Sequence, residues 1–254
     1  MKKYVVMGLL IVVMVVLVFS NAPYEVYTEL IGRSQYYDEA GTLTGSSVEL
    51  VQEIQRRVGD DTEIQVLPWS RAYNLLLTND NVILFSTTLT AERKDLFQWV
   101  GPIFSQPWVF YVKKGSGVVI NSMADAEKLG RIGTYLNDAR EQYLLSLGFN
   151  NIDSAVNEVN NIKKLNTGRI DAMIASPDNF IASCREAGIN EGNFEEAYLV
   201  SEQELYVTFS KNFDATIVEK WQSALKDMYE DGTFEEIYLK WYPDARLPTY
   251  KVVK

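Results

Sequence analysis

A run of hydroxyl side chains from Ser86 to Thr90 is followed by a single cation, Arg93. The run comes directly after Val82–Phe85, a short apolar block that is typical of a buried strand. We expect the chain to become helical here, with Thr90 as the N-cap and Arg93 in the first turn. Open α/β sheets bind their ligands at the carboxyl ends of strands. Because a cation in a first helical turn opposes the helix dipole, a carboxylate held bidentately by Arg93 would compensate for it.

Taken alone, Arg93 could instead pair with Glu92 or Asp95 on a solvated surface. However, the segment Ser86–Arg93 resembles the T-x-T-x-E-R segment of the extracellular solute-binding proteins, family 3, of polar amino-acid transporters. The resemblance covers nearly all of the chain after residue 23 and includes three further segments, Leu43-Thr44-Gly45, Leu67-Pro68-Trp69 and Gly168-Arg169-Ile170-Asp171-Ala172. In that family the arginine clamps the α-carboxylate of the ligand and the upstream threonine supports it. The resemblance therefore implies that Arg93, Thr88 and Ser86 bind the ligand.

The composition limits the kinds of function that the chain can have. A length of 254 residues allows one large domain or two lobes, and 47% apolar with 12% aromatic residues favours a packed globule. The formal net charge of −10 argues against binding to nucleic acid or to an anionic membrane. The chain has no histidine, no zinc spacing and no nucleotide-type glycine loop, so we predict no metal site, no cofactor and no catalytic residue. The single cysteine, Cys184, excludes an internal disulfide, and we interpret it as a small buried hydrophobe.

The N-terminus has the pattern of an export signal. Lys2 and Lys3 form a basic end, and Tyr4–Phe19 is a continuous apolar run. Cleavage after Ser20 is favoured because Pro23 would disfavour a site after Ala22. A retained membrane anchor is the alternative, since the run is only slightly short for a span. We predict a signal peptide over residues 1–22 and a periplasmic mature protein.

The remaining residues predict two successive βα series. Ser46–Val58 should be a helix opened by a capping box and closed by Gly59, while Trp108–Val112 and Glu204–Phe209 should be the strands that cross between lobes. With the resemblance, this order predicts a two-lobed, type II periplasmic-binding-protein-like α/β fold in which each lobe is a sheet flanked by helices. We assign residues 23–112 and 206–254 to lobe 1, and residues 113–205 to lobe 2.

Further candidate ligand-binding residues lie at the ends of other predicted strands. Where members of the family often carry an aromatic-proline segment, this chain has residues 31–36. Glu29, Arg33 and Tyr36 are therefore candidate pocket residues, but each could equally be a surface residue. Trp69 stands at a strand-to-helix corner, where core packing is an equal alternative. On the other wall we expect Tyr135, Asp138, Ala139 and Ser176. The backbone N–H groups from Asn137 to Arg140 open a helix and would receive an anionic or polar ligand group, although Asp138 could itself serve as the cap.

Ser176 and Tyr135 make the expected ligand unusual. Typical members of the family carry an aspartate for the ligand ammonium at the strand end where this chain has Ser176, and some carry a lysine where it has Tyr135. An unpaired buried ammonium is costly, so the sequence favours a carboxylate ligand with a planar or apolar part beside Tyr135. The alternative is that Glu29, Asp138 or Asp178 supplies the missing charge.

We therefore predict a monomeric periplasmic protein that captures a small polar, carboxylate-bearing ligand between its lobes for ABC-type transport through a membrane permease. Two alternatives stay open. One is a ligand-sensing module for a membrane receptor. The other is an enzyme that resembles the cyclohexadienyl dehydratases, although Ala175-Ser176 offers no general acid at the second-lobe strand end.

Overall fold

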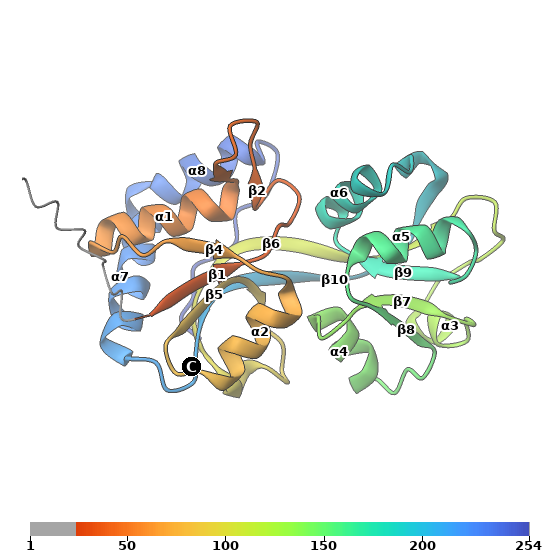
Figure 1. Ribbon diagram of the computed structural model, residues 1–254, viewed down its shortest axis with the longest axis horizontal. Helices are drawn as coiled ribbons and strands as arrows, with labels where there is room; N and C mark the ends of the chain where they lie inside the picture. Colours follow the sequence, from red (N-terminus) through yellow and green to blue (C-terminus); the bar gives the residue numbers. More distant parts are fainter. Residues whose placement is uncertain (1–23, 254) are drawn as a thin grey trace, which may run out of the picture.

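The computed structural model describes residues 24–253, and the predicted signal peptide lies outside these residues. Two α/β lobes stand side by side and are joined by two long strands (Figure 1). This is the two-lobed fold that the sequence predicts. In the described part of the chain, no helix has both the length and the apolar character needed to cross a membrane.

A single mixed sheet runs through both lobes in the strand order β4-β1-β5-β10-β6-β9-β7-β8. Lobe 1 contains β1 (Glu25–Thr28), the hairpin β2 (Tyr36–Tyr37) and β3 (Leu43–Thr44), α1 (Ser46–Val58), β4 (Ile64–Val66), α2 (Trp69–Thr78), β5 (Val82–Thr88), η1 (Lys94–Leu96), α7 (Ala215–Asp231) and α8 (Thr233–Trp241). Lobe 2 contains α3 (Met123–Glu127), β7 (Ile132–Tyr135), α4 (Ala139–Ser146), β8 (Ile152–Ala155), α5 (Glu158–Asn166), β9 (Ala172–Ala175), α6 (Pro177–Ala187) and η2 (Glu191–Asn193).

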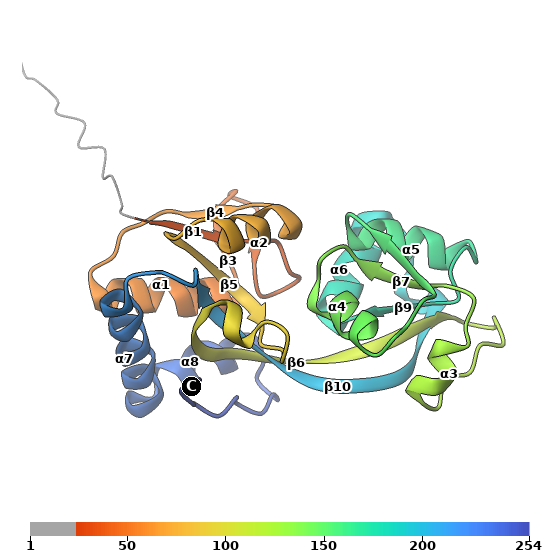
Figure 2. The same cartoon turned by 90° about the horizontal axis from the view of Figure 1, so that it is seen from below.

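The two connecting strands are β6 (Gln98–Lys113) and β10 (Phe194–Phe209), which pair antiparallel along their whole length. Figure 2 shows both strands passing from one lobe to the other. Both crossover strands are longer than predicted. Trp108–Val112 and Glu204–Phe209 are parts of continuous 16-residue strands, β6 and β10. Their alternating side chains enter the cores of both lobes, which fixes the register on either side of the junction.

Apolar side chains pack on both faces of the sheet in each lobe. In lobe 1 one cluster lies under α1, α7 and α8 and contains Trp221 and Phe234, and a second lies under α2 and contains Trp69 and Tyr73. In lobe 2 the two clusters are centred on Phe110 and on the fully buried Cys184 of α6. The prediction that Cys184 is a buried hydrophobe is therefore confirmed.

Two local predictions near helix starts are wrong. No α-helix follows Thr90, and the chain makes a turn and the short 3₁₀ helix η1 before entering β6, so Arg93 lies at a turn. The capping box at Ser46 is absent because Gly45, at φ 126°, brings the backbone against Ser34, and the N–H groups of Ser46 and Ser47 donate to backbone carbonyls there. A Cβ at residue 45 would lie 2.3 Å from the Ser34 carbonyl oxygen, so only glycine fits.

Candidate functional site

The carboxyl end of β5 presents the hydroxyls that the sequence predicts. Ser86 has φ 62° and lies at a bulge, because the pairing of β5 with β10 passes from Thr87 to Phe85 without it. Its hydroxyl accepts a hydrogen bond from the amide of Gln35, which is fully buried. Ser86 and Thr88 are 6% and 7% exposed, and both line a small cavity between the lobes.

Arg93 is buried, with 1% of its surface exposed, and contacts both lobes. Its guanidinium carbon lies 5.2 Å from the ring centre of Trp69 and 4.6 Å from that of Tyr73, so α2 holds the cation against two aromatic faces. Across the cleft, Nε donates to Oε1 of Gln142 (2.8 Å) and Nη2 donates to the carbonyl of Asn137 (3.1 Å). Burial lowers the pKa of Arg93, yet an arginine stays charged in proteins. The result is a desolvated cation whose acceptors from lobe 2 are uncharged.

The lobe 2 wall is organised by Asn137, which precedes the N-cap of α4. Within residues 24–253, Asn137 (φ 62°) and Ser86 are the only non-glycine residues in the left-handed region, and they come from opposite walls of the cleft. The buried carboxylate of Glu141 accepts a hydrogen bond from the Asn137 N–H (2.7 Å) and so holds this conformation. The Asn137 carbonyl thereby faces lobe 1, where it also accepts a hydrogen bond from Nε1 of Trp69 (3.0 Å).

A cluster of charged side chains lies beside this contact. Asp138 caps α4 and accepts from Nε of Arg140 (2.5 Å), whose Nη2 lies 2.8 Å from Oε1 of Glu158. Glu29, at the end of β1, accepts from the Tyr135 hydroxyl (3.2 Å), and that hydroxyl accepts from the Trp69 N–H (3.3 Å).

The cluster shifts the pKa values of its carboxyl groups in different directions. Burial and the nearby negative charge of Asp138 raise the pKa of Glu29 to about 8. Burial also raises the pKa of Glu158, and the positive charge of Arg140 offsets this increase only in part. Burial alone would raise the pKa of Asp138, but Arg140 outweighs it and the pKa falls below its ordinary value. Asp138 and Arg140 thus form an ionised pair, whereas Glu29 has no cation in hydrogen-bond contact among the described residues.

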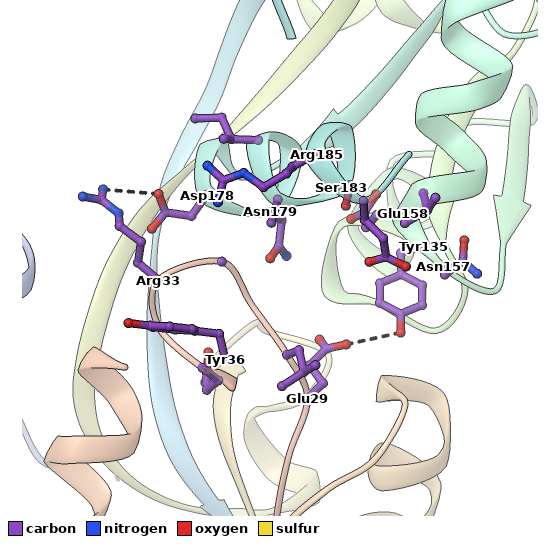
Figure 3. Close-up of a pocket in the computed structure, with 17 residues that line it drawn as sticks. Glu29, Arg33, Tyr36, Tyr135, Asn157, Glu158, Asp178, Asn179, Ser183 and Arg185 are labelled. Carbon is purple, nitrogen blue, oxygen red and sulfur yellow. Dashed lines mark hydrogen bonds and ion pairs between the residues drawn. The ribbon is translucent and has the colours of Figure 1, made fainter. Parts of the chain in front are cut away.

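Two spaces adjoin this cluster. The inner cavity, about 20 Å³, is lined by both lobes, including Ser86, Thr88 and Arg93 from lobe 1 and Asp138, Arg140 and Asn179 from lobe 2. The outer pocket, about 790 Å³, opens beside Glu29, Tyr36, Glu158, Asp178 and Arg185 (Figure 3). Glu29 and Asn179 line both spaces, so the two are adjacent. The inner cavity has room for about one water molecule, because the lobes already touch across it.

The structure places most of the predicted residues at the cleft. Glu29 and Trp69 line the inner cavity with Arg93, while Arg33 and Tyr36 line the outer pocket. Trp69 also packs in the core under α2, so both interpretations of this residue hold.

Two of the predicted lobe 2 residues, Ala139 and Ser176, lie away from the cleft spaces. Tyr135 lines the outer pocket as predicted, although its ring also packs in the lobe 1 cluster with Trp69 and Tyr73, and its hydroxyl donates to Glu29. Ala139 is buried in a lobe 2 cluster, and Ser176 is fully buried at the start of α6, so neither lines the inner or the outer space. Asp178, one of the possible ammonium partners, is held by Arg33 (3.3 Å) and the Tyr242 hydroxyl (2.7 Å).

The side chains of Arg140 and Gln142 and the carbonyl of Asn137 were not predicted from the sequence to lie at the site, although the backbone N–H groups from Asn137 to Arg140 were. A signal for Arg140 was present, because it is a cation in the first turn of a predicted helix, which is the reason for singling out Arg93. Nothing in the sequence marks the carbonyl of Asn137 or the side chain of Gln142, since their role depends on how closely the two lobes approach.

Residues 33–244 match the sequence pattern of the bacterial extracellular solute-binding proteins, family 3. The chain belongs to this family. Its two lobes and paired crossover strands agree with the two-lobed fold that the resemblance implied.

Known proteins resemble the chain over most of its length at low identity. A probable histidine-binding protein of Neisseria gonorrhoeae is 22% identical over 233 residues, which cover 89% of this chain and 82% of that protein. The arginine-binding extracellular protein ArtP of Bacillus subtilis is 21% identical, with coverages of 81% and 80%. Among solved structures, a histidine kinase sensor domain superposes with a TM-score of 0.75 at 16% identity, covering 86% of this chain and 95% of that one. The ancestral amino acid-binding protein AncCDT-1, a precursor of cyclohexadienyl dehydratase, superposes with a TM-score of 0.68 at 23% identity, with coverages of 86% and 94%. At these identities the structures support the fold alone.

Proposed function

We propose that the chain captures a small zwitterionic solute between its lobes after export and delivers it to an ABC-type membrane permease. The observation that carries this proposal is that Arg93 and Glu29 line one cavity, Arg93 as a buried cation and Glu29 as a carboxyl with no cationic partner there. An α-amino acid carries the two complementary charges. Its carboxylate fits the planar fork of Arg93, and its ammonium fits Glu29.

The carboxyl of Glu29 at the cavity changes the class of ligand that was expected from the sequence. The sequence favoured a ligand without a conventionally held ammonium, because Ser176 replaces the usual aspartate. The cavity supports the alternative that was left open, with Glu29 as the counter-ion. Asp138 and Asp178 are already paired with Arg140 and Arg33. The amino-acid-binding relatives agree with this choice.

The route of entry follows from the contacts across the cleft. Arg93 reaches solvent only if the lobes move apart, which breaks its hydrogen bonds to Gln142 and to the Asn137 carbonyl. A ligand carboxylate is a stronger acceptor than either neutral group, since charge-assisted hydrogen bonds are roughly twice as strong as neutral ones. The ligand would then be enclosed when the β6 and β10 strands bend and the lobes close again.

Calorimetry with purified, ligand-stripped protein and the standard L-amino acids tests the proposal. Loss of one partner from a buried charge pair costs about 2–5 kcal/mol, so Arg93→Ala should weaken binding by about 30-fold to a few thousand-fold. Arg93→Lys should also bind poorly, because an ammonium cannot reproduce the fork. The exposed neighbour Lys94 provides the control, and Lys94→Ala should bind normally. Near-normal affinity in Arg93→Ala would exclude the clamp.

One observation favours a second function. A carboxyl with a pKa near 8 is protonated at neutral pH, as a general acid must be, and Glu29 meets that condition. Incubation with prephenate and arogenate tests for a dehydratase. Turnover that disappears in Glu29→Gln would establish the enzyme, whereas its absence beside tight amino-acid binding favours capture.

A further inference from the structure

Arg140 is a second buried cation at the inner cavity. It is the second residue of α4, 4% of its surface is exposed, and it lines the same space as Arg93. Two of its three guanidinium nitrogens contact carboxylates, Nε with Asp138 and Nη2 with Glu158. Among residues 24–253 nothing accepts a hydrogen bond from the third nitrogen, Nη1, although it is buried.

Both the burial and the position of Arg140 are unfavourable by themselves. A buried donor that lacks a partner carries a desolvation cost of about 1–3 kcal/mol. A cation in the first turn also opposes the dipole of α4. Asp138 and Glu158 explain the retention of the charge, but they leave Nη1 unexplained. A ligand oxygen at Nη1 would remove the cost.

The charges around the cavity limit which kind of ligand oxygen could accept a hydrogen bond from Nη1 of Arg140. On the proposed function, the ligand carboxylate neutralises Arg93 and the ligand ammonium neutralises Glu29. Arg140 is already flanked by two carboxylates, so a further anion at Nη1 would be repelled by both. An uncharged carbonyl needs only the donor. A cationic or alkyl side chain offers no acceptor at all.

We propose that Nη1 of Arg140 donates to an uncharged carbonyl oxygen in the side chain of the bound solute, and that the cleft therefore selects an amino acid with an amide side chain. This inference rests on the proposed function and assigns its specificity to Arg140. The adjacent outer pocket offers space for the distal part of such a ligand, since Glu29 and Asn179 line it as well as the inner cavity.

The test compares four probes of similar length on wild-type protein by calorimetry, namely L-glutamine, L-glutamate, L-lysine and L-norvaline. A hydrogen bond to a charged donor corresponds to a preference of about tenfold or more, so glutamine should bind at least that much more tightly than norvaline. Glutamate and lysine should bind more weakly than glutamine.

The variant test removes the donor, Arg140, together with the negative charge of its partner Glu158, which would otherwise be left buried without a cation. Arg140→Met combined with Glu158→Gln should lose the preference for glutamine over norvaline, while Glu158→Gln alone should keep it. The ratio of the two affinities is measured within each folded variant, so a uniform loss of stability does not affect it. Arg131→Met, at an exposed arginine before β7, should leave all affinities unchanged.

The outcomes separate the two proposals. If no amino acid binds, the proposed function fails. If amino acids bind but glutamine has no advantage over norvaline, or if the advantage survives in the double variant, the assignment of Arg140 is wrong and the proposed function stands. Because the comparison of probes on wild-type protein needs no variant, misfolding of the double variant leaves the proposal open to refutation.

Discussion

Closure of the empty cleft should be linked to the uptake of a proton by Glu29. The groups that face this carboxyl come from lobe 2, namely Tyr135 of β7, Asp138 and Arg140 of α4, and Glu158 of α5. With the lobes together, burial and the negative charge of Asp138 raise the pKa of Glu29 to about 8. With the lobes apart, Glu29 meets solvent and its pKa returns toward the ordinary value of 4.5.

The sign of the effect follows from these two values. Between pH 4.5 and pH 8 the closed form binds a proton that the open form does not, so acidification favours closure and the gain is lost as the pH rises through 8. Proton linkage then shifts the ratio of closed to open protein by about ninefold between pH 7 and pH 6, and by about 50-fold between pH 8 and pH 6. The raised pKa of Glu158 acts in the same direction, so a variant at Glu29 is needed to isolate the contribution of that residue.

Small-angle scattering of ligand-stripped protein measures the effect through the radius of gyration. Wild-type protein should become more compact as the pH falls from 8.5 to 6, while Glu29→Gln, which cannot titrate, should show a much flatter profile. Glu39→Gln, at an exposed loop residue of lobe 1, should behave like wild type. A bound zwitterion should also flatten the profile, because its ammonium would hold Glu29 ionised. A wild-type radius that is constant over this range, or an unchanged slope in Glu29→Gln, would refute the reasoning.

Three further predictions concern a contact between the lobes, the close packing at Gly45 and the cleavage of the signal peptide. Gln142→Ala removes an acceptor of Arg93 and should raise the ratio of open to closed empty protein by about tenfold or more, which scattering detects as a larger radius of gyration. An unchanged radius would show that this hydrogen bond does not hold the lobes together. Gly45→Ala should lower the free energy of unfolding by more than about 1 kcal/mol in urea, and Gly41→Ala, where a Cβ meets no atom within 4 Å, should cost less; equal costs would contradict the steric account. N-terminal sequencing of exported protein should find the chain beginning after Ser20, and intact residues 1–22 in the membrane fraction would indicate a retained anchor.

The sequence predicted the lobe structure well because the relevant signals are local. Apolar blocks mark the strands, Gly59 ends α1 in the left-handed region, and Pro177 opens α6 at its first position. The polar end of β5 could be found in the same way, since hydroxyls and a cation follow a buried strand. The turn at Arg93 was missed because the chain must enter β6 five residues later, which leaves no room for a helix.

The lobe 2 wall could not be predicted equally well, because its chemistry depends on contacts between distant segments. Tyr135 has a ring of the kind that stacks on ligands. In the structure this ring also packs against aromatic residues of lobe 1, which lie far from it in the sequence. Likewise, Glu29 differs from a surface glutamate through its burial and through the negative charge of Asp138, which lies more than a hundred positions further along the chain. The pKa of Glu29 is thus a property of the closed arrangement.

The two left-handed residues connect this arrangement to affinity. Such conformations cost about 1–3 kcal/mol each and persist only where their surroundings enforce them. At Asn137 the carboxylate of Glu141 holds the backbone N–H, and Ser86 lies at the bulge between β5 and β10. The Asn137 carbonyl occupies donors of Arg93 and Trp69 that a ligand carboxylate would also use. On the proposed function, a ligand carboxylate would therefore replace an internal acceptor instead of filling an empty site, and the contribution of Arg93 to the free energy of binding would be the difference between the two acceptors. A carboxylate gains from its charge, whereas an uncharged solute would gain little over the carbonyl that it displaces. On this proposal, the internal contact would disfavour neutral solutes at Arg93, and it keeps the buried guanidinium hydrogen-bonded when no ligand is present.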